Sequence, residues 1–208
     1  MKFFVRTVGD RQLDPTYEQI DYVCIIDTER KPIDSFIEAL EIIGNDEALL
    51  LEDDLVLCQN FLEEVNKAIE HFPNKIINFF QRPHYYQPIV ESQDIEFNQC
   101  TYYPAHTAGK IAEVMKTLPR VSTGQKKNMY SLLESAALKQ LGWTLIQYRP
   151  HLVQHKDLDT TLFLYTTHFR RSLYFLDYLT ELGITYEEAP KHFGKLVELC
   201  RRQFERTN

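Results

Sequence analysis

The chain has 208 residues, of which 44% are hydrophobic and 25% are charged, as is usual for a globular protein with one sizeable core. Its formal net charge of −7 argues against a protein that binds nucleic acid by bulk electrostatic attraction. No apolar run approaches the roughly 20 residues of a membrane span, and the first residues turn polar too early for a secretory signal, so we expect no membrane span and a cytoplasmic location.

The first part of the chain alternates short β-rich runs with helical patterns, which indicates βαβ units and a largely parallel sheet. Strands are predicted over residues 3–8, 21–27, 48–51 and 75–80. Apolar spacing predicts one helix from Pro32 that ends before Gly44 and another over residues 61–71. Asn60 and Glu63 have the spacing of a capping box for the second of these helices.

The second part begins with a long segment, residues 81–99, whose aromatic and polar composition is typical of a functional lid. A strand over 101–103, a helix over 107–118, a basic loop at 124–127, a helix that ends at Leu141 and a strand over 144–148 are expected after it. Two helices, 165–182 and 188–206, complete the chain. The last one carries an apolar stripe formed by Phe193, Leu196, Val197, Cys200 and Phe204.

Three consecutive carboxylates, Glu52, Asp53 and Asp54, come directly after the apolar strand at 48–51. In an open α/β sheet, ligands bind outside the carboxyl ends of the strands. Clustered acids at such a place repel one another and lose hydration, so they need a cation or hydrogen bonds to remain ionised. Mg²⁺ or Mn²⁺ is the natural partner, shared with substrate phosphates. The alternative is an acidic surface turn.

Two segments carry a resemblance to a known family. LLLEDDLVLCQNFLEEVNKAI resembles the central motif of GT-A glycosyltransferases, in which an apolar strand ends in a DxD-like triplet, often EDD. GWTLIQYRPHLVQHKDLDTT is similar to the segment of several such families that ends in P-x-L-V-x-H. The resemblance covers about residues 20–162 in pieces. It implies an α/β fold with one GT-A-like, Rossmann-like domain over residues 1–162, a mostly parallel central sheet flanked by helices, and a C-terminal helical extension over 163–208 packed on it.

The resemblance also implies roles for individual residues. Asp54 would bind the metal, Mn²⁺ or Mg²⁺, with His155 as the second protein ligand. Glu52 and Asp53 would face the ribose or sugar of the donor. Lys156, where the chain departs from the family pattern, is a separate candidate for contact with the diphosphate. The families commonly have a Gly and a Ser just after this histidine. Here Lys156 and four further residues of different type follow, which puts the form of the donor-closing loop in doubt.

Glu134 is the candidate general base. If Tyr130–Leu141 is helical, Glu134 falls in the middle of the apolar face, and an inward-pointing acid is costly unless paired. The resembled families often place their catalytic carboxylate in a helix upstream of the P-x-L-V-x-H segment. A helix acid paired with Lys or Arg is the alternative. Tyr102 and Tyr103, whose flat rings suit a sugar or a base, are expected on the acceptor side.

The function implied is metal-dependent transfer of a sugar from a nucleoside-diphosphate sugar, a UDP-sugar first of all, to a hydroxyl acceptor. Compact GT-A enzymes of bacteria and bacteriophages modify surface glycans or hydroxymethylated DNA bases, so the acceptor could be a glycan, a protein or modified DNA, and the acidic charge disfavours DNA. Two other functions remain open. One is a metal-dependent nucleotidyltransferase or nuclease, and the other is a non-catalytic α/β binding module.

Overall fold

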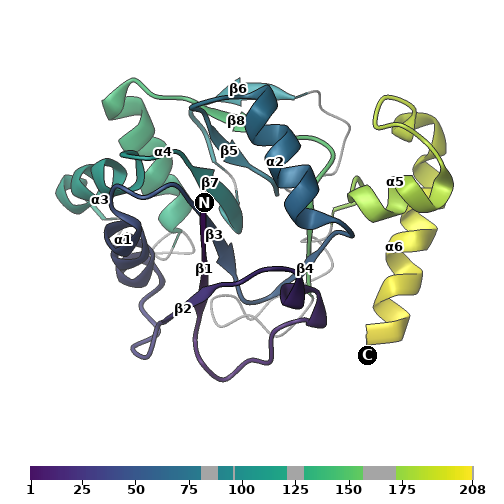
Figure 1. Cartoon of the computed structure of the whole chain (residues 1–208), viewed down its shortest axis with the longest axis horizontal. Coiled ribbons are helices and arrows are strands. Elements are labelled where there is room, and N and C mark those ends of the chain that lie inside the picture. The colour runs from purple at the N-terminus through teal and green to yellow at the C-terminus, as the bar shows by residue number, and fades with distance from the viewer. Residues whose placement is uncertain (81–88, 96, 121–128, 157–171, 208) are drawn as a thin grey trace.

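The computed structural model describes residues 1–80, 89–95, 97–120, 129–156 and 172–207, with side chains up to residue 202. Over these residues the chain forms a seven-stranded sheet with helices on both faces (Figure 1). The strand order is β2 (Val23–Ile26), β1 (Lys2–Thr7), β3 (Ala48–Glu52), β7 (Cys100–Tyr103), β5 (Ile76–Asn78), β8 (Leu145–Gln147) and β6 (Val90–Ser92).

Five of these strands run in one direction. β1 is parallel to both β2 and β3, and β5 is parallel to β8. β7 lies antiparallel between β3 and β5, and β6 is antiparallel to β8 at the edge. The predicted α/β class with a mostly parallel central sheet is therefore confirmed, with two antiparallel strands inserted in it.

Successive side chains of the strands point to opposite faces and build two cores. In β3, Leu49 and Leu51 belong to the core under α2 (Phe61–His71). Ala48 and Leu50 belong to the core under α1 (Pro32–Ile43), α3 (Ala108–Thr117) and α4 (Tyr130–Leu141). β3 is thus buried on both sides, as expected of a central strand with a continuous apolar sequence.

The predicted ends of α1 and α2 are confirmed, but the predicted capping box is wrong. Asn60 has a left-handed backbone (φ +60°) and makes no side-chain capping bond, whereas a capping residue needs an extended backbone. Side chains from elsewhere in the chain take over this role. Gln19 accepts the amide hydrogen of Phe61 (3.2 Å), and the carboxylate of Asp177 accepts that of Gln59 (2.9 Å).

Most predicted elements of the second part are confirmed within two residues, and two short strands are added, β6 and β9 (Val153–His155). β6 lies inside the segment 81–99, for which no strand was expected, because Val-Glu-Ser carries no apolar alternation. It pairs with β8 by backbone hydrogen bonds and is exposed at the sheet edge. The predicted basic loop at 124–127 and residues 81–88 of the predicted lid lie outside the described residues.

The C-terminal part differs most from expectation. Residues 172–175 are irregular where a helix over 165–182 was predicted, and Phe175 forms a β-bridge with His151; residues 165–171 lie outside the described part. α5 spans only Leu176–Leu182. The last helix opens as a 3-10 turn, Ala189–His192, before α6 (Phe193–Thr207).

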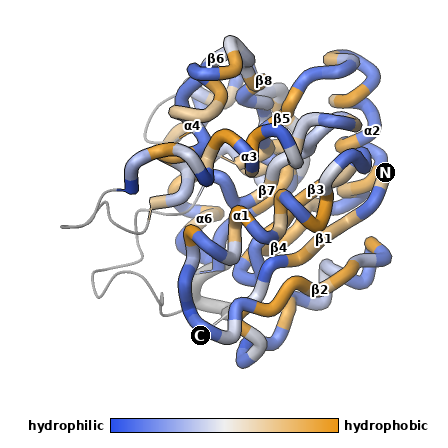
Figure 2. The backbone as a smooth tube through the Cα atoms, turned by 90° about the vertical axis from the view of Figure 1, so that its left-hand side faces the viewer, coloured by the Kyte–Doolittle hydropathy of each residue, from blue (hydrophilic) through white to orange (hydrophobic). Residues whose placement is uncertain are grey.

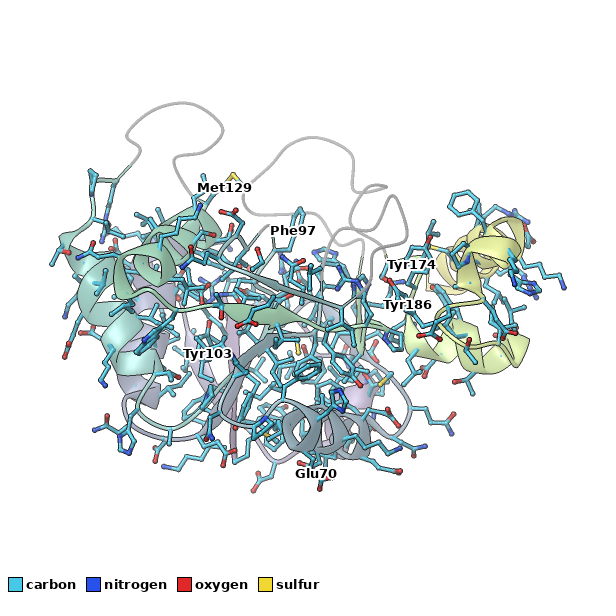
Figure 3. The ribbon with its side chains drawn as sticks, turned by 90° about the horizontal axis from the view of Figure 1, so that it is seen from above. Glu70, Phe97, Tyr103, Met129, Tyr174 and Tyr186 are labelled. Carbon is cyan, nitrogen blue, oxygen red and sulfur yellow. The ribbon has the colours of Figure 1, made fainter. Side chains whose placement is uncertain are left out.

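The predicted apolar stripe of α6 is partly wrong. Leu196, Leu199 and Cys200 are buried, but the side chains of Phe193 and Val197 are 46% and 41% exposed, because the helix packs through its Leu199 side. Tyr174 and Tyr186 meet edge to face at 5.6 Å beside these helices (Figure 3). The buried residues of α5 and α6 join the core that also holds Leu49 and Leu51.

The edge of the sheet opposite β6 is β2, an apolar strand (Figure 2) whose Val23 and Ile26 are exposed. β2 pairs with β1 on one side, and its β-branched residues are of the type that favours strands. Within the described residues, none of the helices is long and apolar enough to cross a membrane.

Candidate functional site

The acidic triplet lies at the carboxyl end of β3, where the chain turns into β4 (Leu55–Leu57). Asp53 and Asp54 are only 2% and 8% exposed, and Glu52 is half-buried. An acidic surface turn would present these carboxylates to water. Their burial instead requires partners, and each acid has a different set.

Glu52 is held from β1 and α4. Arg6 lies opposite Glu52 in the parallel register of β1 and β3 and pairs with its Oε1, while the Tyr130 hydroxyl donates to the same oxygen (2.7 Å). Burial lowers the pKa of Arg6, but the charge of Glu52 outweighs it, so the pKa lies above its ordinary value. The guanidinium also stacks on Tyr130, whose ring in turn stacks on Phe36. Oε1 of Glu52 is therefore fixed.

Asp53 is held by the loop that follows β1. The Thr7 hydroxyl donates to Oδ2 (2.7 Å), and the backbone amide of Val8 approaches the same oxygen at 3.4 Å. Arg11 donates from Nη1 to Oδ1 (2.9 Å) and also reaches Oδ2 of Asp54 (3.2 Å). One guanidinium nitrogen thus bridges two adjacent buried carboxylates.

Asp54 meets His155 across the small sheet that β4 forms with β9 (Val153–His155). In this antiparallel pair Leu55 lies opposite His155, and the backbone amide of Lys156 donates to the Asp54 carbonyl (2.7 Å). His155 Nε2 lies 3.3 Å from Asp54 Oδ2. His155 is 1% exposed, and neither of its ring nitrogens makes a hydrogen bond to the described residues. The predicted convergence of Asp54 and His155 is present.

The two side chains fit a divalent cation. Two ligands at about 2.1 Å from an octahedral ion, at a right angle, lie roughly 3 Å apart, close to the separation seen here. An imidazole beside a carboxylate favours Mn²⁺ over Mg²⁺, because Mg²⁺ prefers oxygen ligands alone. Within the described part of the chain, no group of three or more His, Cys, Asp and Glu side chains is placed to hold a metal. Phosphate oxygens and water usually fill the remaining positions of such ions.

Lys156, predicted to contact a donor diphosphate, pairs with Asp14 (Nζ to Oδ2 2.9 Å). Burial raises the pKa of Asp14, but the hydrogen bonds from Lys156 and Thr16 outweigh it and leave the pKa below its ordinary value. The ion pair ties the loop after β1 to the end of β9. Lys156 therefore borders the site. Its side chain pairs with Asp14, and its backbone amide is the group that meets the acidic triplet, at the Asp54 carbonyl.

Glu134 faces inward as predicted, and it is completely buried. The Tyr103 hydroxyl donates to Oε1 (2.7 Å) and the Asn98 side-chain amide donates to Oε2; Tyr103 lies inside the domain (Figure 3). Burial raises the pKa of Glu134 to about 7, although both hydrogen bonds oppose the rise. Its described partners are thus neutral side chains rather than a Lys or Arg.

No described contact joins Glu134 to the acidic triplet. The two are connected indirectly: Tyr130 lies one helical turn before Glu134 on α4, and its hydroxyl donates to Glu52. Tyr102 and Tyr103, expected on the acceptor side, are both buried in strand β7, and the Tyr102 hydroxyl donates to Glu47. In this conformation their rings fill the two cores and present no face to an acceptor.

Four residues that hold the acids were not singled out from the sequence: Arg6, Thr7, Arg11 and Tyr130. The first three end β1 or follow it, and they meet β3 only because the two strands are parallel neighbours. A sequence signal existed for Arg6. A lone arginine inside a β-rich run that is otherwise apolar needs a buried acid, and Glu52 ends the other central strand.

Comparison with models of protein families finds none that matches this sequence, and comparison with curated proteins finds no significant match.

Proposed function

We propose that the chain is a metal-dependent glycosyltransferase that uses a nucleoside-diphosphate sugar, with UDP-sugars as the first donors to test. The observation that carries the proposal is the meeting of Asp54 and His155, from two distant segments, at the carboxyl end of the central strand β3. Open α/β sheets bind nucleotides at this edge. A buried histidine whose ring nitrogens make no hydrogen bond to the described residues, next to a buried carboxylate, is the donor set that a divalent cation would complete.

In the proposed reaction the bond between the anomeric carbon and the diphosphate oxygen breaks, and the acceptor hydroxyl oxygen bonds to that carbon. The nucleoside diphosphate leaves with the electron pair, and the acceptor loses its proton to a base. A bound Mn²⁺ would neutralise charge on the diphosphate. Asp54 and His155 would hold the ion, while Glu52, whose Oε1 is held by Arg6 and Tyr130, would accept hydrogen bonds from donor hydroxyls with its Oε2.

The base is a separate part of the proposal. Glu134 has a pKa of about 7, which suits proton transfer near neutral pH. To reach an acceptor, however, it has to leave Asn98 and Tyr103. Its assignment therefore requires that donor binding rearranges this pair of hydrogen bonds.

The test is Mn²⁺-dependent binding of a panel of nucleoside diphosphates, nucleoside triphosphates and nucleotide-sugars, followed by measurement of the nucleoside diphosphate or pyrophosphate that is released. We expect at least one donor to bind only with Mn²⁺, and Asp54→Asn to weaken Mn²⁺ binding by about 100-fold, since even residues behind a metal ligand cost about 10- to 100-fold. Asp46→Asn, at an exposed acid paired with Lys2, is the control and should match the parent.

Three results would count against the proposal. They are a panel with no Mn²⁺-dependent donor, an Asp54→Asn variant that binds and turns over donors like the parent, and release of pyrophosphate from nucleoside triphosphates. The last result would favour a nucleotidyltransferase. Binding without turnover, with Asp54→Asn equal to the parent, would favour a binding module.

A further inference from the structure

Arg11 lies where a cation for the acidic pair is expected. Its Nη1 is 2.9 Å from Asp53 Oδ1 and 3.2 Å from Asp54 Oδ2. The same Asp54 oxygen lies 3.3 Å from His155 Nε2, so the guanidinium and the imidazole meet at one carboxylate oxygen. The Arg11 side chain is mostly buried, at 16% exposed.

A divalent ion between Asp54 and His155 would lie about 2 Å from the Asp54 oxygen. Arg11 Nη1 contacts that oxygen, so the ion and the guanidinium would be neighbours in a partly buried place where like charges repel strongly. The two cations compete for one acid. Asp53 keeps its place without Arg11, because Thr7 and the Val8 amide also donate to it.

The loop that carries Arg11 is tied down on both sides. Before it, the Gly9 amide donates to the Thr7 hydroxyl (3.0 Å), and after it Asp14 pairs with Lys156 (2.9 Å). The loop backbone therefore keeps its position while the long Arg11 side chain swings aside. A rotamer change of Arg11 then exchanges one cation for the other.

We propose that Arg11 is an intramolecular competitor of the divalent cation: it pairs with Asp53 and Asp54 in the metal-free chain and leaves Asp54 when the ion binds. Arg11 thereby sets the metal affinity of the site. The inference rests on the proposed metal dependence, and it assigns to Arg11 a role that can be measured without any sugar donor.

The experiment is a Mn²⁺ titration of the metal-free full chain, followed by the electron paramagnetic resonance signal of free Mn²⁺. We expect Arg11→Gln to bind Mn²⁺ about tenfold more tightly than the parent, which corresponds to about 1.4 kcal/mol. Arg30→Gln removes the same charge from the neighbouring loop between β2 and α1 without touching the acids, and it should stay within about twofold of the parent, since exposed ion pairs contribute little.

A second measurement does not depend on the stability of Arg11→Gln. In the parent, the guanidinium N–H resonances of Arg11, assigned by their loss in Arg11→Lys, should shift on addition of diamagnetic Mg²⁺. The inference is overturned if Arg11→Gln binds Mn²⁺ no more tightly than the parent, or if these resonances do not move at saturating Mg²⁺. If parent, Arg11→Gln and Arg30→Gln all fail to bind Mn²⁺ and Mg²⁺, the proposed function fails as well.

Discussion

Glu134 brings an ionisable group into a core whose other members are apolar or hydrogen-bonded neutral side chains. Burial raises the pKa of this carboxyl from 4.5 to about 7. A folded-state pKa above the unfolded value means that the folded state binds the proton more tightly. The stability from this site is therefore complete below pH 4.5 and is lost as the pH rises through about 7.

We expect Glu134→Gln to remove that loss. Each pKa unit corresponds to about 1.4 kcal/mol, so the parent should lose roughly 3 kcal/mol relative to Glu134→Gln between pH 4.5 and pH 8. Urea unfolding at several pH values measures this difference. Glu113→Gln, the same change at an exposed position of α3, should keep the parental pH dependence. Parallel curves for the parent and Glu134→Gln would show that Glu134 titrates as an ordinary exposed acid does.

At the scale of elements, the buried side-chain amide of Gln154 in β9 holds the segment that leads into the C-terminal helices. Gln154 donates to the Ser172 carbonyl (2.8 Å) and accepts the Ser172 amide hydrogen (2.7 Å), as a neighbouring strand would. The Ser172 hydroxyl meets His151 Nδ1. Burial lowers the pKa of His151 well below its ordinary value, so the contact is between neutral groups.

Gln154→Ala leaves both backbone groups of Ser172 without this partner. Each buried unsatisfied group costs about 1–3 kcal/mol, so we expect amide exchange of residues 172–182 to accelerate at least tenfold. Hydrogen–deuterium exchange read by mass spectrometry measures the change, with β1 and β3 as internal references. Gln140→Ala, at an exposed position of α4, is the control. Equal acceleration in β1 and β3 would mean that the substitution loosens the whole fold instead.

The same elements show how far the sequence predicts the fold. β3 and α1 follow from local signals: a continuous apolar run in one case, and an N-terminal proline with a C-terminal glycine in the other. The start of α2 does not, because Gln19 and Asp177, from distant segments, bond the amides at its beginning. β6 exists only because β8 offers it backbone partners.

The site divides in the same way. The acids and His155 could be predicted because a strand end and a motif mark them, and β4 and β9 bring Asp54 and His155 together. Arg11 could not, since it lies in a loop without periodicity and meets the acids only through the parallel packing of β1 on β3. The buried partners of Glu134, Asn98 and Tyr103, depend on how α4 packs against β7.

At the scale of the whole molecule, the question is whether the C-terminal helices fold with the sheet or apart from it. Leu196 of α6 is completely buried, in the core that also contains Leu49 and Leu51. The single tryptophan, Trp143, packs against the other core, under α1, α3 and α4. Its fluorescence therefore reports on the core under α1, α3 and α4, to which no described residue of α6 contributes.

We expect Leu196→Ala to destabilise the entire fold, because a cavity in a shared core weakens every element that lines it. Truncation of a buried leucine costs about 2–5 kcal/mol, whereas Val197→Ala, at the adjacent exposed position, should cost about 0.5 kcal/mol or less. Urea unfolding followed by Trp143 fluorescence and by far-UV circular dichroism measures whether the helices and the sheet unfold together.

If the helices and the sheet form one cooperative unit, both signals shift together to lower urea in Leu196→Ala. If the fluorescence midpoint stays at the parental value while the dichroism shows an early partial transition, α5 and α6 unfold by themselves and the shared core does not couple them to the sheet.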